Sequence, residues 1–262
     1  MTEPQIRFDD GAAYEAFMGV WSRSVGEIFL AWLAPLAGLA WLDVGCGNGA
    51  FTELLNARTA PARILGVDPS PAQLDYARKR HNAGVAEFVQ GDAMDLPAPD
   101  RSFDAAVMAL VIFFVPQPSK GVAEMVRVLQ PGGLAAAYAW DLKGGGFPLQ
   151  VIHEELEALG LPSPMPPSAE ASRMDVLRSL WELGGLRDVE TKVITVDRSF
   201  PDFETLWAIN MAGPRLSAVS SAMTPEQRAA LKSNVKARLI ADAQGRIICS
   251  ARANAIKGRL AL

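Results

Sequence analysis

Short apolar runs alternate with amphipathic segments through the first half of the chain, and this alternation limits the possible folds. Strand-like runs separated by helical patterns or turns lie at Ala40–Val44, Arg63–Val67, Ala86–Gln90, Phe103–Leu110 and Leu134–Trp140. Strands that alternate with helices form parallel sheets through right-handed crossovers. The pattern therefore predicts an α/β fold with a doubly wound, mostly parallel sheet.

The second half of the chain is less regular, but we expect two more strands there, over 187–200 and 246–257, which makes a seven-stranded sheet. Loop signals lie at Gly144-Gly145-Gly146 and Leu161–Pro167. Four segments have the form of a capping box and predict helix starts: Ser24–Glu27, Ser70–Gln73, Ser172–Asp175 and Thr224–Gln227.

Composition excludes several classes of protein. The 262 residues are 50% hydrophobic and have a net charge of −4. A chain of this length is most simply a single domain. Its net negative charge argues against nucleic-acid binding through bulk positive charge. Cys46 and Cys249 are too few for a disulfide framework or a four-cysteine zinc site, so we expect no metal. The six tryptophans are expected mostly as core anchors.

The apolar stretches are short. Ile28–Leu42 is interrupted by Pro35, and Ala105–Val115 is shorter still, whereas a membrane span needs about 20 residues. The acidic N-terminus shows no apolar signal segment. We therefore expect a cytoplasmic protein without a membrane span.

A glycine-rich turn follows the first strand in the sequence LDVGCGNGA. Gly45, Gly47 and Gly49 would let the backbone turn sharply and approach a ligand without an intervening Cβ. A tight turn with no ligand is the alternative interpretation. Asp68 ends the second strand about 20 residues later, where a carboxylate can hold the two hydroxyls of a ribose.

Two adenosyl cofactors fit this arrangement, a nicotinamide dinucleotide and S-adenosylmethionine. Asp43, just before the glycine loop, would repel a pyrophosphate but could hold an ammonium group. Asp92 follows the third strand, where an adenine amino group could lie, and the glycine loop contains no basic residue. These features favour S-adenosylmethionine.

The chain resembles the class I S-adenosylmethionine-dependent methyltransferases, in particular the small-molecule subgroup that includes quinone-biosynthesis enzymes. The matching segments occur in the family's order: LDVGCGNGAFTELL, GVDPS, QGDAMDLP, SFDAAVMALVIFFVPQP and RVLQPGG. The segment YEAFMGVWSR also looks like the N-terminal cofactor cover of that subgroup.

The resemblance implies a Rossmann-like methyltransferase in a single domain, 1–262. Its expected parts are a helical cofactor cover over 1–39, a cofactor-binding core over 40–140, lid insertions over 141–186 and 201–245, and final strands over 187–200 and 246–257.

The resemblance also implies a role for each matching site residue. The methionine part would lie against Asp43, Gly45, Cys46, Gly47 and Gly49, its carboxylate would meet Tyr14 and Arg23, and Asp68 would take the ribose hydroxyls. The adenine would lie beside Pro69, Ser70, Gly91, Asp92, Ala93 and Met94, and the path to the methyl group would pass Ala109 and Leu110.

The segment after the fourth strand points to the acceptor. Val111–Val115 is apolar where relatives often have polar residues or histidine, and we expect Phe113 or Phe114 to face the site or its lid. This favours a small, apolar acceptor, with oxygen, nitrogen and carbon all open as the methylated atom. His153 and Asp141 are weak candidates for a general base, so none is assigned.

Two other functions stay open at this point. One is a nicotinamide-dependent oxidoreductase, and the other is a cofactor-binding or partner protein without turnover. The segment Pro225–Leu262 has eight basic and two acidic residues, which indicates either a solvated surface or a site for an anionic partner. The sequence leaves the oligomeric state open.

Overall fold

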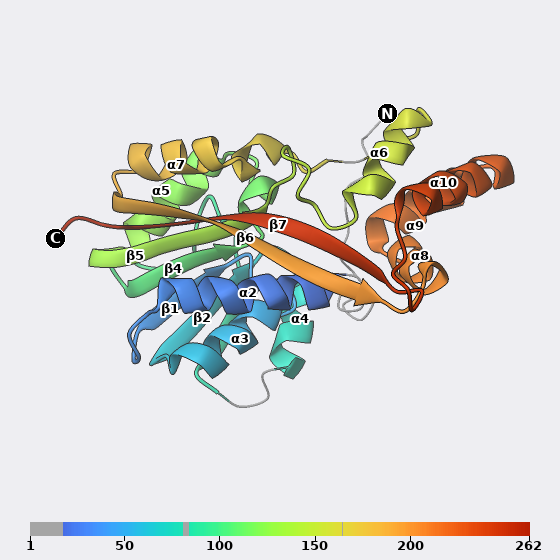
Figure 1. Cartoon of the computed structure of the whole chain (residues 1–262). Coiled ribbons are helices and arrows are strands. Elements are labelled where there is room, and N and C mark those ends of the chain that lie inside the picture. Colours follow the sequence, from blue (N-terminus) through green and yellow to red (C-terminus); the bar gives the residue numbers. More distant parts are fainter. Residues whose placement is uncertain (1–17, 81–83, 164) are drawn as a thin grey trace.

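A computed structural model describes residues 18–80, 84–163 and 165–262. Its centre is one seven-stranded sheet with the strand order β3-β2-β1-β4-β5-β7-β6 (Figure 1). The strands are β1 (Ala40–Val44), β2 (Arg63–Asp68), β3 (Ala86–Gln90), β4 (Phe103–Ala109), β5 (Leu129–Trp140), β6 (Arg187–Phe200) and β7 (Ile247–Arg259). The predicted seven-stranded α/β sheet is confirmed.

The first five strands are parallel, and β7 runs antiparallel to both of its neighbours. In the middle of the sheet Asp43 of β1 is in register with Gly66 of β2 and Val107 of β4. Tyr138 of β5 pairs with Ala109 on one side and with Ala255 of β7 on the other. The carboxyl ends of β1 to β5 therefore meet at one edge of the sheet, where open α/β sheets bind ligands.

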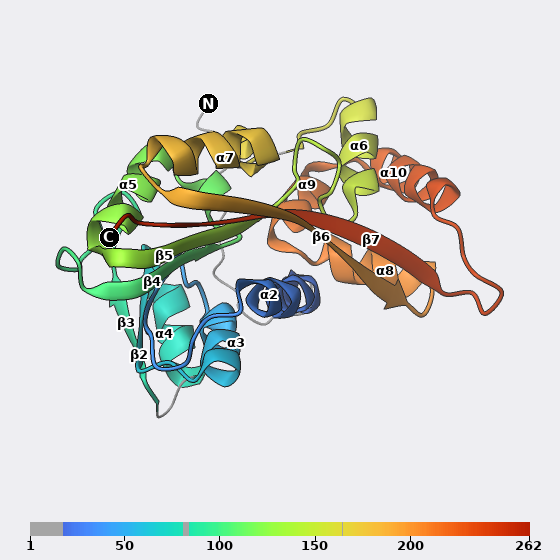
Figure 2. The same ribbon diagram turned by 60° about the vertical axis from the view of Figure 1, so that its left-hand side comes forward.

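Helices cover both faces of the sheet (Figures 1 and 2). One face is covered by α2 (Val20–Leu33), α3 (Ala50–Thr59) and α4 (Pro71–Arg80), and the other by α5 (Pro118–Val128) and α7 (Met174–Leu183). A Cβ on Gly26 would lie 2.8 Å from Leu54, so α2 packs closely on α3. Phe29 of α2 packs against Tyr138, with ring centroids 4.6 Å apart.

The long strands β6 and β7 form a ribbon that extends past the rest of the sheet and supports further helices (Figure 2). Their ladder ends at the pair Phe200–Ile247, and between these residues lie α8 (Phe203–Met211), α9 (Pro214–Ala222) and α10 (Pro225–Arg238). Helix α6 (Gln150–Ala158) packs against α10.

Two of the four predicted capping boxes start helices. The Thr224 box before α10 is complete, and the hydroxyl of Ser70 accepts from the N–H of Gln73 at the start of α4. The Ser24 prediction was wrong because α2 begins earlier, and Ser24 donates to Val20 inside it. Near Ser172 a helix does begin, at Met174, but Ser172 does not cap it, since its hydroxyl is buried and donates to Ala169.

The segment over 141–186 divides into two parts. Its first part leaves the sheet and forms α6, but α7 lies on the sheet and contacts β6 and β7. The indole N–H of Trp181 on α7 donates to the carbonyl of Ala135 at 3.1 Å. The lid interpretation therefore concerns α6 and α8 to α10. In the described part of the chain, no helix has the length and apolar character needed to cross a membrane.

Candidate functional site

The glycine loop makes the turn from β1 into α3. Gly45, Gly47 and Gly49 all have left-handed backbone conformations, with φ of 73°, 52° and 77°. The N–H groups of Gly45 and Cys46 donate to the carbonyl of Val67, which fastens the loop to β2. Among the described residues the space around Gly47 is open, because a Cβ there would have only Gln73 as a neighbour, at 4.0 Å.

Asp68 lies at the end of β2 and holds the glycine loop directly. One carboxylate oxygen accepts from the N–H of Gly47 and the other from the N–H of Ser70, each at 2.9 Å. Burial raises the pKa of Asp68, and these two hydrogen bonds act in the opposite direction. Each oxygen keeps a second lone pair, so the carboxylate can still accept from two hydroxyl groups.

Asp43 is fully buried at the end of β1. Its Oδ2 accepts from the hydroxyl of Thr52 at 2.6 Å, whereas its Oδ1 has no partner in the described part of the chain. Burial raises the pKa of Asp43 to about 7; the bond from Thr52 opposes this rise and the nearby Asp68 adds to it. An orphaned carboxylate oxygen here fits a ligand with an ammonium group.

Asn48 belongs to the same loop, but the sequence interpretation missed it. Its side chain is buried, its carbonyl oxygen accepts from the N–H of Ala50, and its Nδ2 has no partner among the described residues. A polar side chain inside a glycine loop was the available signal.

The residues predicted to meet the adenine follow β3. Gly91 donates its N–H to the carbonyl of Asp68, so this turn lies beside the end of β2. The side chain of Asp92 is exposed and accepts from the N–H of Met94 at 2.8 Å. Pro69, Ser70 and Ala93 lie at the same edge of the sheet, and the adenine contacts stay a prediction.

The end of β4 reaches the glycine loop from the other side. After Ala109 the chain turns at Leu110, which has a left-handed φ of 62° and donates its N–H to the carbonyl of Tyr138. The next side chain, Val111, lies so close to Gly45 that a Cβ there would be 2.5 Å from it.

Phe113 and Phe114 form a short helical turn after Val111, and their ring centroids lie 4.7 Å apart. Phe113 is buried and Phe114 is half-buried. Ser168 fixes the segment from outside, because its N–H donates to the carbonyl of Phe113 and its hydroxyl to that of Val115.

Three predicted cofactor residues lie outside the cluster around Asp68. Tyr14 is outside the described residues, and Arg23 is exposed on α2. Cys46 is buried and packs with Leu74 and Phe88 beneath the loop. Burial first, and then the charges of Asp43 and Asp68, raise the pKa of its thiol far above the usual range.

Both candidates for a general base contact other side chains. The Nδ1 of His153 lies 3.1 Å from the hydroxyl of Ser163, and its ring packs edge-on against Phe147. Asp141 binds the guanidinium of Arg252 at 2.7 Å and fixes the turn after β5. Within the described ranges no cluster of His, Cys, Asp and Glu could hold a metal ion.

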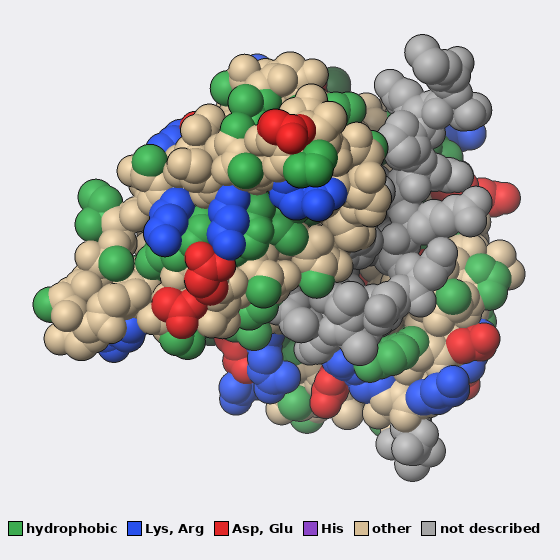
Figure 3. Space-filling model, turned by 90° about the vertical axis from the view of Figure 1, so that its right-hand side faces the viewer, with side chains coloured by type: hydrophobic (Ala, Val, Ile, Leu, Met, Phe, Trp, Pro, Cys, Tyr) green, Lys and Arg blue, Asp and Glu red, His purple; other side chains and the backbone are tan. Residues whose placement is uncertain are grey.

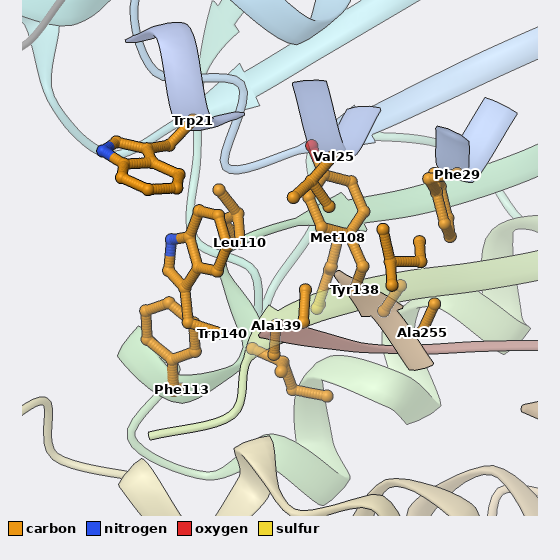
Figure 4. Packing of buried hydrophobic residues seen from close by; sticks show 14 of the residues in the cluster. Trp21, Val25, Phe29, Met108, Leu110, Phe113, Tyr138, Ala139, Trp140 and Ala255 are labelled. Carbon is orange, nitrogen blue, oxygen red and sulfur yellow. The ribbon is translucent and has the colours of Figure 1, made fainter. Parts of the chain in front are cut away.

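Two tryptophans, expected only as core anchors, lie next to the end of β4. Trp21 of α2 and Trp140 at the end of β5 lie on either side of Leu110, and Phe113 lies beyond Trp140 (Figure 4). The position of Trp21 within YEAFMGVWSR, the segment compared with a cofactor cover, was the signal available in the sequence.

The basic residues near the C-terminus mostly pair with acidic ones. Arg238 of α10 binds Glu154 and Glu155 of α6, and Lys232 binds Glu204 of α8. On this face Lys and Arg side chains lie beside Asp and Glu (Figure 3). These contacts favour a structural role, since they hold α6, α8 and α10 together.

Comparison with known proteins gives a consistent result. Residues 42–137 match the sequence family described as a methyltransferase domain. The fatty-acid O-methyltransferase of Mycolicibacterium smegmatis is 40% identical over 100 residues, which are 38% of this chain and 36% of that protein. Phthiotriol/phenolphthiotriol dimycocerosates methyltransferase 1 of Mycobacterium ulcerans is 32% identical over 168 residues, 64% of this chain and 58% of that protein.

The matches thus span between about one third and three fifths of these curated relatives. Among solved structures, phosphoethanolamine N-methyltransferase 2 of Haemonchus contortus, in complex with phosphomonomethylethanolamine and S-adenosylhomocysteine, has a TM-score of 0.61 at 17% identity. That match covers 99% of this chain and 59% of the other. The cyclase SpnF has a TM-score of 0.56 at 22% identity, covering 92% and 82%. At these identities the structures show the fold alone.

Proposed function

We propose that this chain, which belongs to the class I S-adenosylmethionine-dependent methyltransferases, transfers a methyl group to a small, apolar acceptor. The observation that carries the proposal is the pair of buried carboxylates at the glycine loop. Asp68 holds the loop and keeps two lone pairs, and Asp43 has an orphaned oxygen. Together they fit the two hydroxyls and the ammonium group of one ligand.

S-adenosylmethionine, when bound, supplies a methyl group on a positively charged sulfur, and the sulfur keeps the electron pair of the broken bond as a neutral thioether. The residues of this chain would bind the cofactor and the acceptor, orient them toward each other and exclude water. Asp68 would hold the ribose, and Asp43 the ammonium group. The turn at Asp92 would meet the adenine, and Leu110 would lie on the path to the acceptor.

The acceptor proposal rests on what surrounds the ends of β4 and β5. Leu110, Phe113, Trp21 and Trp140 are all buried and apolar, which suits an apolar molecule. Two relatives, by their names, methylate a fatty acid and phthiotriol or phenolphthiotriol dimycocerosates. The helices α6 and α8 to α10 would form the lid. The cytoplasmic location and the lack of a nucleic-acid partner stay predictions.

The first test is cofactor identity. S-adenosylhomocysteine should raise the melting temperature of the protein, because a ligand that binds only the folded state stabilises it, and NAD should not. Calorimetry that shows heat of binding for NAD and none for S-adenosylhomocysteine would refute the methyltransferase function. Labelled S-adenosylmethionine and a panel of apolar acceptors would then separate turnover from binding alone.

A further inference from the structure

We propose that the indole N–H groups of Trp21 and Trp140 bind a carboxylate on the methyl acceptor, which makes the acceptor an apolar carboxylic acid. The inference rests on the methyltransferase function proposed above and names the acceptor class of that site. Its basis is the position, burial and hydrogen bonding of these two side chains.

Both tryptophans lie beside Leu110, at the end of β4 (Figure 4). Trp21 is in the first turn of α2 and is 1% exposed, and Trp140 is the last residue of β5 and is 2% exposed. Leu110 lies between them (Figure 4). The residue after Leu110, Val111, lies against Gly45. Only the end of β4 therefore separates the two tryptophans from the glycine loop.

The two indole nitrogens point the same way. In Figure 4 both lie on the side of the carboxyl ends of β4 and β5, away from Tyr138 and Ala255. Among the described residues, neither the indole nitrogen of Trp21 nor that of Trp140 takes part in a hydrogen bond. The indole N–H of Trp181, by contrast, donates to the carbonyl of Ala135. Within the described ranges, the Nε1 atom of Trp41 is shut off from solvent and has no hydrogen-bond partner, whereas the Nε1 atoms of Trp21 and Trp140 are not shut off from solvent.

Among the described residues no group accepts from these two N–H groups, so a ligand can supply the acceptor. The indole N–H only donates, so its partner must be an acceptor, which argues against an ammonium group. A carboxylate has two oxygens and can accept from both indoles at once, in hydrogen bonds strengthened by its charge. The rings of Trp21, Trp140 and Phe113 would surround the apolar part of such a molecule.

A carboxylate acceptor also needs no general base. It is ionised at neutral pH, so no proton has to be removed before its oxygen can react. An alcohol would need a base to remove its proton, and the sequence and structure assign none. The expected product is therefore a methyl ester.

The experiment compares dodecanoate, 1-dodecanol and dodecylamine as acceptors with S-adenosylmethionine labelled in its methyl group. We expect only dodecanoate to be labelled. Trp21→Phe and Trp140→Phe keep an aromatic ring but remove the N–H, so each should raise the KM for dodecanoate about tenfold. The affinity for S-adenosylhomocysteine should not change.

Trp32→Phe is the matched control, because Trp32 lies on the same helix as Trp21 but packs against Lys257, and its KM should stay at the wild-type value. A second readout is the binding of dodecanoate to the wild-type complex with S-adenosylhomocysteine, measured by calorimetry and by the indole N–H Raman band. Because it uses the wild-type protein, a folding defect in one variant does not affect it.

Wild-type KM values in both variants, or preferential methylation of the alcohol or the amine, would overturn the proposal. So would a protein that binds S-adenosylhomocysteine but neither binds nor methylates dodecanoate. Failure to bind S-adenosylhomocysteine at all would instead refute the function on which the proposal rests.

Discussion

The ends of β1 to β3 and the ends of β4 and β5 form two halves of one edge, and they differ in chemistry. The first half presents backbone N–H groups, left-handed glycines and the carboxylates of Asp43, Asp68 and Asp92. The second half presents Leu110, Phe113 and Trp140, with Trp21 brought onto it by α2. One half suits a polar, charged cofactor, and the other suits an apolar acceptor that has a single polar group.

The difference teaches how each half is encoded. The polar half comes from short segments in which the functional residues are neighbours in the sequence. The apolar half is assembled from residues far apart in the chain. Substitutions in the two halves should therefore separate cofactor binding from acceptor binding, and the following predictions test that separation.

Gly47→Val should have the largest effect. A valine side chain would fill the open space at Gly47, so binding of S-adenosylhomocysteine should fall about thousandfold or more, which corresponds to over 4 kcal/mol. The left-handed φ should cost only about 1–2 kcal/mol of folding free energy. Calorimetry and thermal melting measure the two effects.

Gly38→Val is the control for this prediction, because Gly38 has a left-handed φ of 79° and no described residue within 4 Å of its Cβ position. It lies before β1, at the opposite edge of the sheet from Gly47. The two variants should melt alike, and only Gly47→Val should lose the ligand. Normal binding by Gly47→Val would mean that the cofactor lies elsewhere.

Asp43→Asn should change the pH dependence of stability. Burial raises the pKa of Asp43 to about 7 in the folded state, against about 4 when unfolded, so the folded protein binds the extra proton between these values. The free energy of unfolding should therefore fall as pH rises from about 4 to 7, by up to about 4 kcal/mol from this group. The asparagine variant should lack this part of the slope in denaturant titrations.

A ligand with an ammonium group adds a second test of Asp43. S-adenosylhomocysteine should lower the pKa of Asp43 and release protons on binding near pH 6.5, whereas 5′-methylthioadenosine, which lacks the amino-acid part, should not. Calorimetry in buffers of different ionisation enthalpy detects the difference. Equal proton release by both ligands would place the ammonium group away from Asp43.

Asp68→Asn should weaken the binding of S-adenosylhomocysteine about ten- to a hundredfold, or about 1.5–3 kcal/mol, because it removes the charge from a hydrogen-bond acceptor. Asp75→Asn on the exposed side of α4 is the control and should bind normally. Acceptor KM measured at saturating cofactor should be unaffected. An unchanged cofactor affinity with an intact fold would show that Asp68 only braces the glycine loop.

Arg238→Gln should have the smallest effect. It breaks the exposed ion pairs between α10 and α6, and such pairs contribute little to stability. We expect a change of a few-fold in acceptor KM at low salt, which disappears at high salt, and no change in cofactor affinity. Arg178→Gln breaks an exposed pair on α7 and serves as the control. A loss of cofactor affinity in Arg238→Gln would contradict the division into two halves.

The sequence predicted the sheet correctly and placed the glycine loop and its carboxylates at strand ends, because both depend on local patterns; the cofactor contacts of these residues stay a prediction. Gly45, Gly47 and Asp68 follow strands, and the end of a parallel strand is easily recognised. The capping boxes at Ser24 and Ser172 failed since packing outweighs a local hydrogen bond: α2 buries Trp21 ahead of Ser24, and Ser172 is itself buried.

The apolar half could not be predicted in the same way. Nothing in the sequence near Trp140 indicates that Trp21 will lie beside it, because the crossovers between the strands decide their proximity. For the same reason, α7 could not be distinguished from the lid helices. Its apolar face is more pronounced than theirs, but such a face can pack either on a sheet or on other helices, and only its contacts in the structure show that it packs on β6 and β7.

The pairing of Phe200 with Ile247 has a consequence for how this fold can change. The segment with α8, α9 and α10 begins after Phe200 and ends before Ile247, and these two residues are paired in the sheet. The segment is therefore a closed loop that can be exchanged as a unit. The entropy of closing such a loop depends only on the logarithm of its length, and doubling the length costs only about 0.6 kcal/mol. Insertions, deletions or replacement of the whole segment would therefore leave the sheet and the glycine loop nearly undisturbed. Changes in the segment with α8, α9 and α10 would therefore alter the proposed acceptor preference while the glycine loop, Asp43 and Asp68 stay the same.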